Sequence, residues 1–232
     1  MSKKKETKGP FIKKSGYVLA LVEFIDIQRL NGFSIYNNDI YILPRKPTNE
    51  TEAILAIKLN IFQKILQNAY LNNEDNIVNC KCEYIQTLRN CQPLKNIDEI
   101  HTLYIKYSFI INRIVNHLIE EGWTDNYILI NVEPKGYNEL EKTYPAPILT
   151  IPGGRMEEID NDDFEECAFR EFYEETLIHI KNSNYLCLTK DLLKCSKNST
   201  YNHFNKKKNK NKKNIKISWY YSIKLFNPKF VD

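Results

Sequence analysis

Three glutamates placed close together on one expected helix are the residues with the clearest chemistry. Residues 151–178 read IPGGRMEEIDNDDFEECAFREFYEETLI, with good helix formers from Asp163 onward. Glu171, Glu174 and Glu175 stand at positions i, i+3 and i+4, so a helix carries all three carboxylates on one face. Clustered carboxylate oxygens are the ligands that Mg²⁺ and Mn²⁺ prefer. The spacing therefore predicts a divalent-metal site, and a solvated acidic helix face is the alternative.

The residues around the three glutamates favour the metal site. Arg170 lies one helical turn from both Glu166 and Glu174, where a guanidinium can orient carboxylates. A Pro-Gly-Gly turn at residues 152–154 precedes the helix, and its backbone can approach a metal ion or a phosphate closely. The acidic string alone is more typical of a solvated surface. The turn and the arginine reverse that preference.

The same residues resemble the Nudix box, the Gly-x5-Glu-x7-Arg-Glu-U-x-Glu-Glu-x-Gly-U signature in which U is a bulky aliphatic residue. The match is complete over residues 170–175. The interval from Gly154 to the arginine is two residues longer than the motif, which indicates a loop insertion. Counting back from the arginine, the motif's first glutamate falls on Asp162, a further expected metal ligand, with Glu158 as its competitor. Leu177 replaces the motif's last glycine, at the exit of the helix.

The resemblance implies an enzyme, a hydrolase of diphosphates with Mg²⁺ or Mn²⁺ as its cofactor. It implies that Glu174 and Glu175 are the principal metal ligands and that Glu171 is a ligand or helps to activate water. By the same resemblance, the Gly153 carbonyl is a further ligand and Arg170 orients the glutamates. These roles agree with the physical chemistry, because a divalent cation neutralises a diphosphate and lowers the pKa of bound water.

Within this superfamily, the residues are most similar to those of the mRNA-decapping Nudix enzymes of large DNA viruses, of the poxvirus and African swine fever virus type. That resemblance implies capped RNA as the substrate, 7-methyl-GDP as the product and a cytoplasmic location, in the host cytoplasm for a viral protein. A diphosphoinositol polyphosphate or a nucleotide diphosphate is the alternative substrate. An aromatic residue such as Trp123, Trp219 or Tyr220 is suited to stack on a methylated guanine, although each is more typical of a core position.

A catalytically inactive RNA-binding module is the alternative of another class. It is favoured by the sequence's end at Asp232, soon after an expected strand and without the closing helix often found in the Nudix fold.

The charge distribution also points to a polyanionic partner. Formal net charge is +4, but residues 206–216 carry +7 and residues 1–14 carry +5, which leaves −8 for the remainder. An acidic body with two basic segments suits a metal site combined with a grip on RNA phosphates. Solvated low-complexity sequence is the alternative for either run. The lysines expected to bind RNA are Lys206, Lys207, Lys208, Lys210, Lys212 and Lys213.

Hydrophobic patterning predicts the elements that position the site. Residues 15–24 form a continuous apolar run, typical of a strand covered on both faces. Helical periodicity is strong from Thr51 to Leu71 and over 98–121. The order of elements predicts an α+β fold, and the resemblance narrows it to a Nudix-type α/β/α sandwich with a mixed sheet and a helical insertion. Further strands are expected at 37–46, 126–132, 147–151 and 184–189, and a hairpin with arms near 199–204 and at 215–226.

The expected organisation is a basic tail, a Nudix core in two segments and an inserted helical domain. These parts correspond to residues 1–14, to 15–48 with 122–232, and to 49–121. Six cysteines lack the paired spacing of a zinc site, so we expect reduced thiols in an intracellular protein. No apolar run approaches the roughly 18 residues of a membrane span, so no membrane partner is expected.

Overall fold

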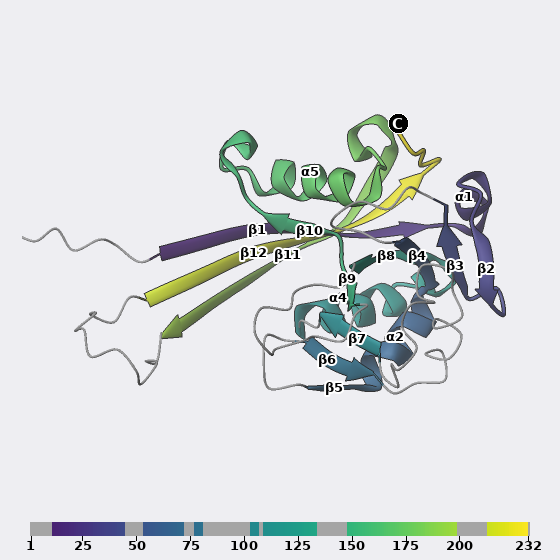
Figure 1. Ribbon diagram of the computed structural model, residues 1–232, viewed down its shortest axis with the longest axis horizontal. Coiled ribbons are helices and arrows are strands. Elements are labelled where there is room, and N and C mark those ends of the chain that lie inside the picture. The colour runs from purple at the N-terminus through teal and green to yellow at the C-terminus, as the bar shows by residue number, and fades with distance from the viewer. Residues whose placement is uncertain are drawn as a thin grey trace, which may run out of the picture.

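The computed structural model describes residues 11–44, 53–71, 77–80, 103–106, 109–133, 148–198 and 213–231 (Figure 1). They form one mixed sheet with helices on both of its faces, which confirms the α+β class.

In the part of the chain that the structure describes, the sheet has twelve strands, and most neighbouring strands are antiparallel. Two pairs are parallel, namely β1 with β12 and β7 with β9. The main path runs through β11 (Asn184–Asn198), β12 (Lys213–Phe226), β1 (Phe11–Val22), β8 (Tyr127–Glu133), β9 (Ile148–Thr150), β7 (Leu103–Lys106), β6 (Ile77–Cys80) and β5 (Ala69–Leu71). The strands off this path are β10 (Gly153–Arg155), which pairs with β1, and the branch β2 (Phe33–Tyr36), β3 (Ile40–Leu43) and β4 (Ala53–Lys58), which joins β8.

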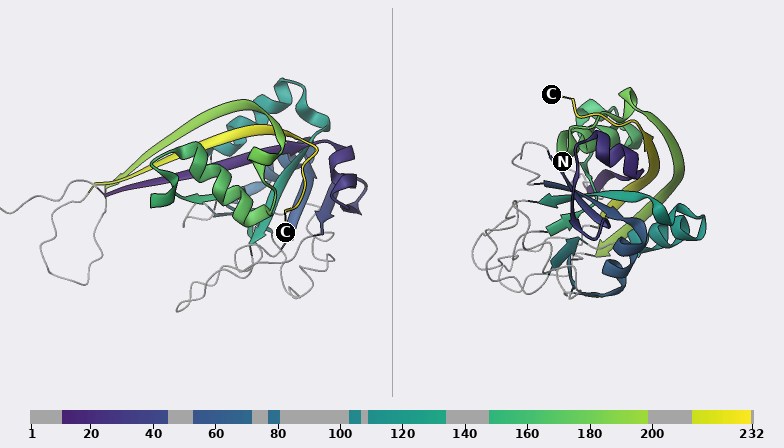
Figure 2. Two further views of the ribbon diagram at one scale, coloured as in Figure 1. Left: turned by 90° about the horizontal axis from the view of Figure 1, so that it is seen from above. Right: turned by 90° about the vertical axis from the view of Figure 1, so that its right-hand side faces the viewer.

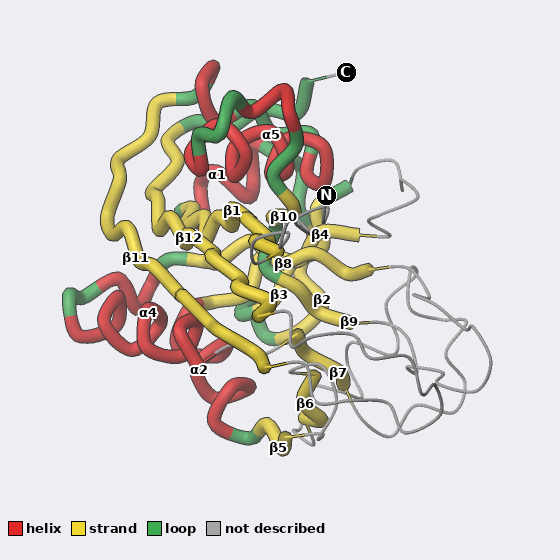
Figure 3. Tube along the Cα trace, turned by 90° about the vertical axis from the view of Figure 1, so that its left-hand side faces the viewer, coloured by secondary structure: helices red, strands yellow, loops and turns green. Residues whose placement is uncertain are grey.

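Helices cover the sheet from two sides. Helix α5 (Phe164–Thr176) lies over β1, β10 and β12, and α1 (Phe24–Arg29) lies at the end of β1 (Figures 1 and 2). Helices α2 (Leu59–Gln67) and α4 (Phe109–Glu120) pack against each other on the opposite side, as Figure 3 shows. Short 3₁₀ turns occur at η2 (Trp123–Asp125), η3 (Glu158–Asp160) and η4 (Ile180–Asn182). No helix in these ranges has the length and apolar character needed to cross a membrane.

Strand β1 contributes to two separate hydrophobic cores because its side chains alternate between the faces of the sheet. Leu19 and Leu21 pack in the core with α2 and α4, whereas Val18 and Ala20 pack in the core with α5. The continuous apolar run in the sequence is therefore a strand buried on both faces, as predicted. The strand begins earlier than expected, at Phe11, so the last residues of the expected basic tail belong to the sheet.

The segment 49–121 is not simply helical. The helix expected from Thr51 begins only at Leu59, because β4 precedes it in the sheet between β3 and β8. Every residue from Ala53 to Ile57 is buried, with alternate side chains in opposite cores, and such a continuous apolar run fits a helical period equally well. The second expected helix likewise divides, into β7 and the shorter α4.

The strand expected at 184–189 is longer than predicted and forms an antiparallel pair with the second arm of the expected hairpin. Strand β11 is continuous from Asn184 to Asn198 and pairs with β12 along its length, with a register irregularity between Cys187 and Thr189. The arm expected near 199–204 lies outside the described residues. Five of the six lysines expected to bind RNA also lie outside the described residues. The sixth, Lys213, is the first residue of β12.

The described cysteine side chains are free thiols. Cys167 is buried, and Cys187 and Cys195 are exposed. Cys82 and Cys91 fall outside the described ranges.

Candidate metal centre

Helix α5 is fixed at its start by a side-chain cap and by close packing on β1. The Oδ1 atom of Asp163 accepts hydrogen bonds from the backbone N–H groups of Glu165 and Glu166, at 2.7 and 3.3 Å. A Cβ atom added at Gly16 would lie 2.7 Å from the backbone nitrogen of Ala168. The helix backbone therefore rests directly on the strand, and this contact places the glutamate face beside β10.

Lysines neutralise the acids near the start of the helix. Each of these ion pairs joins α5, or the loop before it, to a neighbouring element at the surface. The pairs are Glu165 with Lys190 at 2.7 Å, Glu166 with Lys181, and Asp162 with Lys14. This part of the acidic segment is the solvated face that the composition suggested as the alternative.

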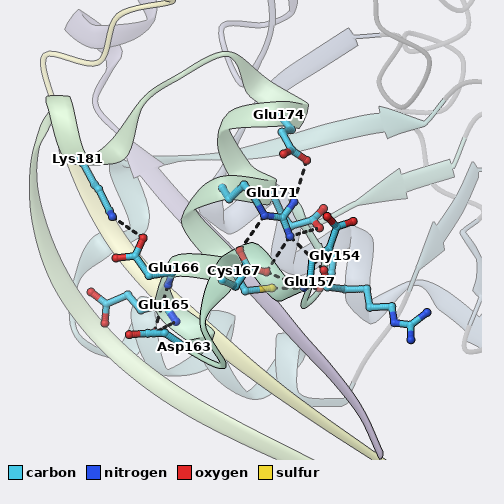
Figure 4. A network of polar contacts seen from close by, with 12 residues as sticks. Gly154, Glu157, Asp163, Glu165, Glu166, Cys167, Glu171, Glu174 and Lys181 are labelled. Atoms are coloured by element: carbon cyan, nitrogen blue, oxygen red, sulfur yellow. Dashed lines mark hydrogen bonds and ion pairs between the residues drawn. The ribbon is translucent and has the colours of Figure 1, made fainter.

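The acids further along the helix surround Arg170 instead (Figure 4). Its guanidinium makes a two-pronged contact with Asp160, from Nε to Oδ1 at 2.8 Å and from Nη2 to Oδ2 at 2.9 Å. It also donates to Glu171 Oε1 at 2.9 Å and to Glu174 Oε2 at 3.0 Å. Asp160 is buried and Glu174 is exposed. Hydrogen bonds from Arg170 hold the pKa of Asp160 below its ordinary value, and those bonds raise the pKa of the arginine in return.

Glu171 lies against the glycine turn. A Cβ atom at Gly154 would lie 2.1 Å from Glu171 Oε2, so only a residue without a side chain leaves room for this carboxylate. Beneath it, the Cys167 thiol lies 3.8 Å from the Gly154 carbonyl oxygen as a weak donor. Burial raises the pKa of Cys167 to about 12, so the thiol stays neutral and is not a reactive nucleophile.

Glu175 is the buried member of the group. Its Oε2 atom accepts hydrogen bonds from the backbone N–H of Gly153 at 2.8 Å and from Asn131 Nδ2 at 2.6 Å. Asn131 is fully buried on β8, and within the described part of the chain its Oδ1 atom has no hydrogen-bond partner. Thr150, the cross-strand neighbour of Asn131, has a buried Oγ1 atom in the same situation. Buried polar atoms without a partner are uncommon in folded proteins, and one of these two belongs to the residue that donates to Glu175.

The structure brings together most of the predicted site residues. Glu171 and Glu174 meet at Arg170, and Glu175 meets Gly153 in the glycine turn. Gly153 has a φ of +145°, which explains why a glycine stands there.

Asp162 is not brought to the site. Its side chain is 70% exposed and faces Lys14, and Glu158 is exposed in η3. Asp160 takes the place beside the arginine because the inserted residues form η3, and its Oδ2 atom also accepts from the backbone N–H of Glu157. The sequence count from Arg170 assumed a regular approach to the helix, whereas η3 places Asp160, two residues before Asp162, beside the arginine.

Asn131 was missed by the sequence reasoning. The only signal was an asparagine inside the apolar run of β8.

The aromatic residues considered for cap stacking have packing roles. Tyr220 is buried and stacks on Tyr17, with ring centroids 4.8 Å apart. Trp219 packs near Phe164, and Trp123 packs against the core with α2 and α4.

Glutamate carboxylates and a glycine backbone are the kinds of donor that a hard divalent cation prefers, so the residues present fit Mg²⁺ or Mn²⁺ by their chemistry. In the described ranges, no three His, Cys, Asp or Glu side chains already lie in a ligand geometry. These carboxylates accept hydrogen bonds from groups of the protein itself, namely Arg170, the Gly153 N–H and Asn131.

Comparisons of the chain with models of protein families, with curated proteins and with solved structures find no match. The case for this site therefore rests on its own residues.

Proposed function

We propose that the protein is a divalent-metal-dependent Nudix-type hydrolase that releases 7-methyl-GDP from capped RNA. The observation that carries the proposal is the gathering of Glu171, Glu174 and Glu175 by Arg170 and the glycine turn. The resemblance of residues 170–175 to the Nudix box supports it, and so does the placement of helices on both faces of a mixed sheet.

The three glutamates and the Gly153 carbonyl would hold Mg²⁺ or Mn²⁺, which neutralises the diphosphate and lowers the pKa of bound water. Arg170, anchored on the buried Asp160, holds Glu171 and Glu174 in one orientation. The Gly153 N–H and Asn131 fix Glu175. Glu171, pressed against Gly154, is the carboxylate proposed to help activate the attacking water.

Capped RNA fits the charge of the chain better than a small diphosphate does. The basic residues are concentrated in two segments outside the acidic body, and such segments bind a long polyanion more effectively than a single nucleotide. The resemblance to the decapping members of the superfamily points the same way.

The test is release of 7-methyl-GDP from cap-labelled RNA with Mn²⁺ or Mg²⁺. We expect Glu174→Gln and Glu175→Gln each to lower the rate by at least about 100-fold, because each substitution removes a ligand charge. Glu166→Gln is the matched control. It removes the same charge from the same helix, but Glu166 pairs with Lys181 away from the site, so its rate should stay at the wild-type level.

The other outcomes separate the alternatives. Cleavage of a diphosphoinositol polyphosphate or a nucleotide, without cleavage of capped RNA, would keep the site and overturn the substrate. RNA binding that is unchanged by Glu174→Gln, with no turnover of any diphosphate at any metal concentration, would favour an inactive RNA-binding module.

A further inference from the structure

A cavity of about 610 Å³ lies where α1 meets the segment that follows β12, two elements that Figure 1 shows close together. A volume of this size falls within the roughly 300–1,000 Å³ typical of small-molecule sites. Its walls come from the end of α1 and the turn after it, from the residue after β3, and from residues 227–230. The candidate metal centre is built instead from β8, β10 and α5. The cavity is therefore a separate site.

Arg29 is held in place at one wall of the cavity. Its Nη1 group donates to Asp26 Oδ1 at 3.4 Å and to Asn227 Oδ1. Asp26 is only 3% exposed, and its Oδ1 atom also accepts from the backbone N–H of Asn227 at 3.2 Å. Among the described residues, the Nε and Nη2 groups of Arg29 have no hydrogen-bond partner, and its side chain is half exposed. This edge of the guanidinium has the spacing that binds two oxygens of one phosphate.

A second cation lines the same cavity. Lys229 is exposed and makes no ion pair with any described residue. No aspartate or glutamate is among the described residues of the lining, because Asp26 is buried outside it, with both carboxylate oxygens already accepting hydrogen bonds. The lining therefore carries two positive charges, of which Asp26 balances one, and it favours an anion.

The rest of the lining suits a flat, partly polar molecule. Phe230 is partly buried, and Pro44 and Pro228 add apolar surface. Asn31 and Asn227 bring two side-chain amides from turns in which both residues have a left-handed φ, of +57° and +51°. Amide groups can hydrogen-bond to the edge of a base, and an aromatic ring can stack on its face.

The wall formed by residues 227–230 is attached to the end of α5 as well as to α1. Ile178 and Phe230 form a β-bridge, and the backbone N–H of Val231 donates to the Leu177 carbonyl oxygen at 2.9 Å. The contacts of Asn227 with α1 hold the other end of this wall. The cavity is thus preformed, so a ligand does not have to order it.

We propose that this cavity binds a nucleotide. Arg29 and Lys229 contact the phosphates, and the base lies against Phe230 and the asparagine amides. A free phosphate would use only the two cations, so the aromatic and amide walls are what favour a nucleotide. The proposal stands apart from the proposed hydrolase function, because it uses none of the three glutamates of the candidate metal centre.

Binding of ADP to the full chain in EDTA tests the site without metal or turnover, and isothermal titration calorimetry measures it. We expect ADP to bind at least about 5-fold more tightly than either inorganic pyrophosphate or adenosine, because each of these lacks one part of the contacts. Equal affinities for ADP and pyrophosphate would overturn the assignment to a nucleotide. No binding of ADP would overturn the site altogether.

Substitutions locate the bound ADP. Lys229→Gln should weaken binding about 5-fold and Arg29→Gln at least about 10-fold, as expected for an exposed charge pair and a two-pronged contact. Thermal melts check the fold, and Lys229→Gln keeps the test open if loss of the Asp26 partner unfolds Arg29→Gln. Lys64→Gln is the matched control, an exposed lysine on α2, which packs on the other face of the sheet. Equal losses for Lys64→Gln and Lys229→Gln would overturn the proposal, because binding would then depend on net charge alone.

One further variant distinguishes this cavity from the candidate metal centre. Glu174→Gln should not weaken ADP binding in EDTA, although it should slow release of 7-methyl-GDP. ADP binding through Lys229 in a protein without cap cleavage would support the cavity and overturn the proposed function, and cap cleavage without ADP binding would do the reverse. Binding of single-stranded RNA that depends on Lys229, without binding of ADP, would overturn the nucleotide in favour of an RNA-binding surface.

Discussion

Replacement of Asp160 tests whether this residue anchors Arg170. The sequence alone pointed to Asp162 as a metal ligand, and the structure places Asp160, two residues earlier, against the guanidinium of Arg170. Asp160→Asn keeps the size of the side chain and removes the charge. Asp162→Asn makes the same change in the same loop, on a side chain that faces Lys14 and solvent.

The contacts of Asp160 indicate how much stability its replacement should cost. The Asn variant loses the charge behind two hydrogen bonds of 2.8 and 2.9 Å at a carboxylate that is only 2% exposed. Hydrogen bonds to charged groups contribute about 1.5–3 kcal/mol each, but Arg170 keeps Glu171, Glu174 and the Arg155 carbonyl oxygen as partners. We therefore expect Asp160→Asn to lower the free energy of unfolding by about 2–3 kcal/mol. Asp162→Asn should cost less than about 1 kcal/mol, as for other exposed ion pairs.

Urea unfolding at a series of pH values measures how much unfolding free energy Asp160→Asn loses. It also shows whether that loss comes from the charge of the Asp160 carboxylate. The pKa of Asp160 is lowered in the folded state, so its contribution is complete above the unfolded pKa of about 3.9 and is lost as pH falls through the folded pKa. The difference between wild type and Asp160→Asn should stay constant from neutral pH down to about pH 5. It should shrink only below about pH 4, where the wild-type carboxyl becomes protonated.

The same two variants connect the anchor to activity. We expect kcat/KM to fall about 10–100-fold in Asp160→Asn, because the guanidinium then holds Glu171 and Glu174 less firmly. Asp162→Asn should keep wild-type activity. A larger effect from Asp162→Asn than from Asp160→Asn, on either stability or activity, would refute the assignment of the anchor.

Substitutions at three further positions test the backbone around the site. Gly154→Ala should lower activity by at least about 10-fold with little loss of stability, because the new methyl group meets the flexible end of Glu171, and activity assays with thermal melts check both. Gly16→Ala should destabilise the fold by about 1–3 kcal/mol in urea unfolding, because its methyl group lies 2.7 Å from the backbone of Ala168, which cannot move without the helix. At Leu177, where φ is +59°, melting temperatures should show that valine costs about 1–2 kcal/mol more than glycine, since a β-branched residue tolerates this conformation poorly.

Local signals predicted the acidic helix well. The sequence indicated a helix from Asp163 onward, and the structure has α5 (Phe164–Thr176) with Asp163 as its cap. Leu177 ends the helix in the left-handed conformation that favours glycine. The cap, the composition and the helical spacing all act within a few residues, so they can be recognised in a sequence before the fold is known.

Features that depend on contacts between distant segments could not be predicted from the sequence. The sequence predicts a helix over β4 because a continuous apolar run fits a helical period as well as a strand, and only its place between β3 and β8 makes it a strand. Asp160 was missed because its contact with Arg170 depends on the path of η3. Asn131 lies on a strand 44 residues from Glu175, a pairing that no local pattern encodes.

The guanidinium of Arg170 contacts one buried and one exposed carboxylate, and this difference determines how it can position metal ligands. At one end it is fixed on Asp160, whose side chain is 2% exposed, by a two-pronged contact. At the other end it holds Glu174, whose side chain is 46% exposed, through one hydrogen bond of 3.0 Å. A cation that approaches Glu174 competes with the weaker contact and leaves the stronger one in place. Arg170 therefore stays oriented whether or not Glu174 is bound to it, which is what a metal site needs from the residue that positions its ligands.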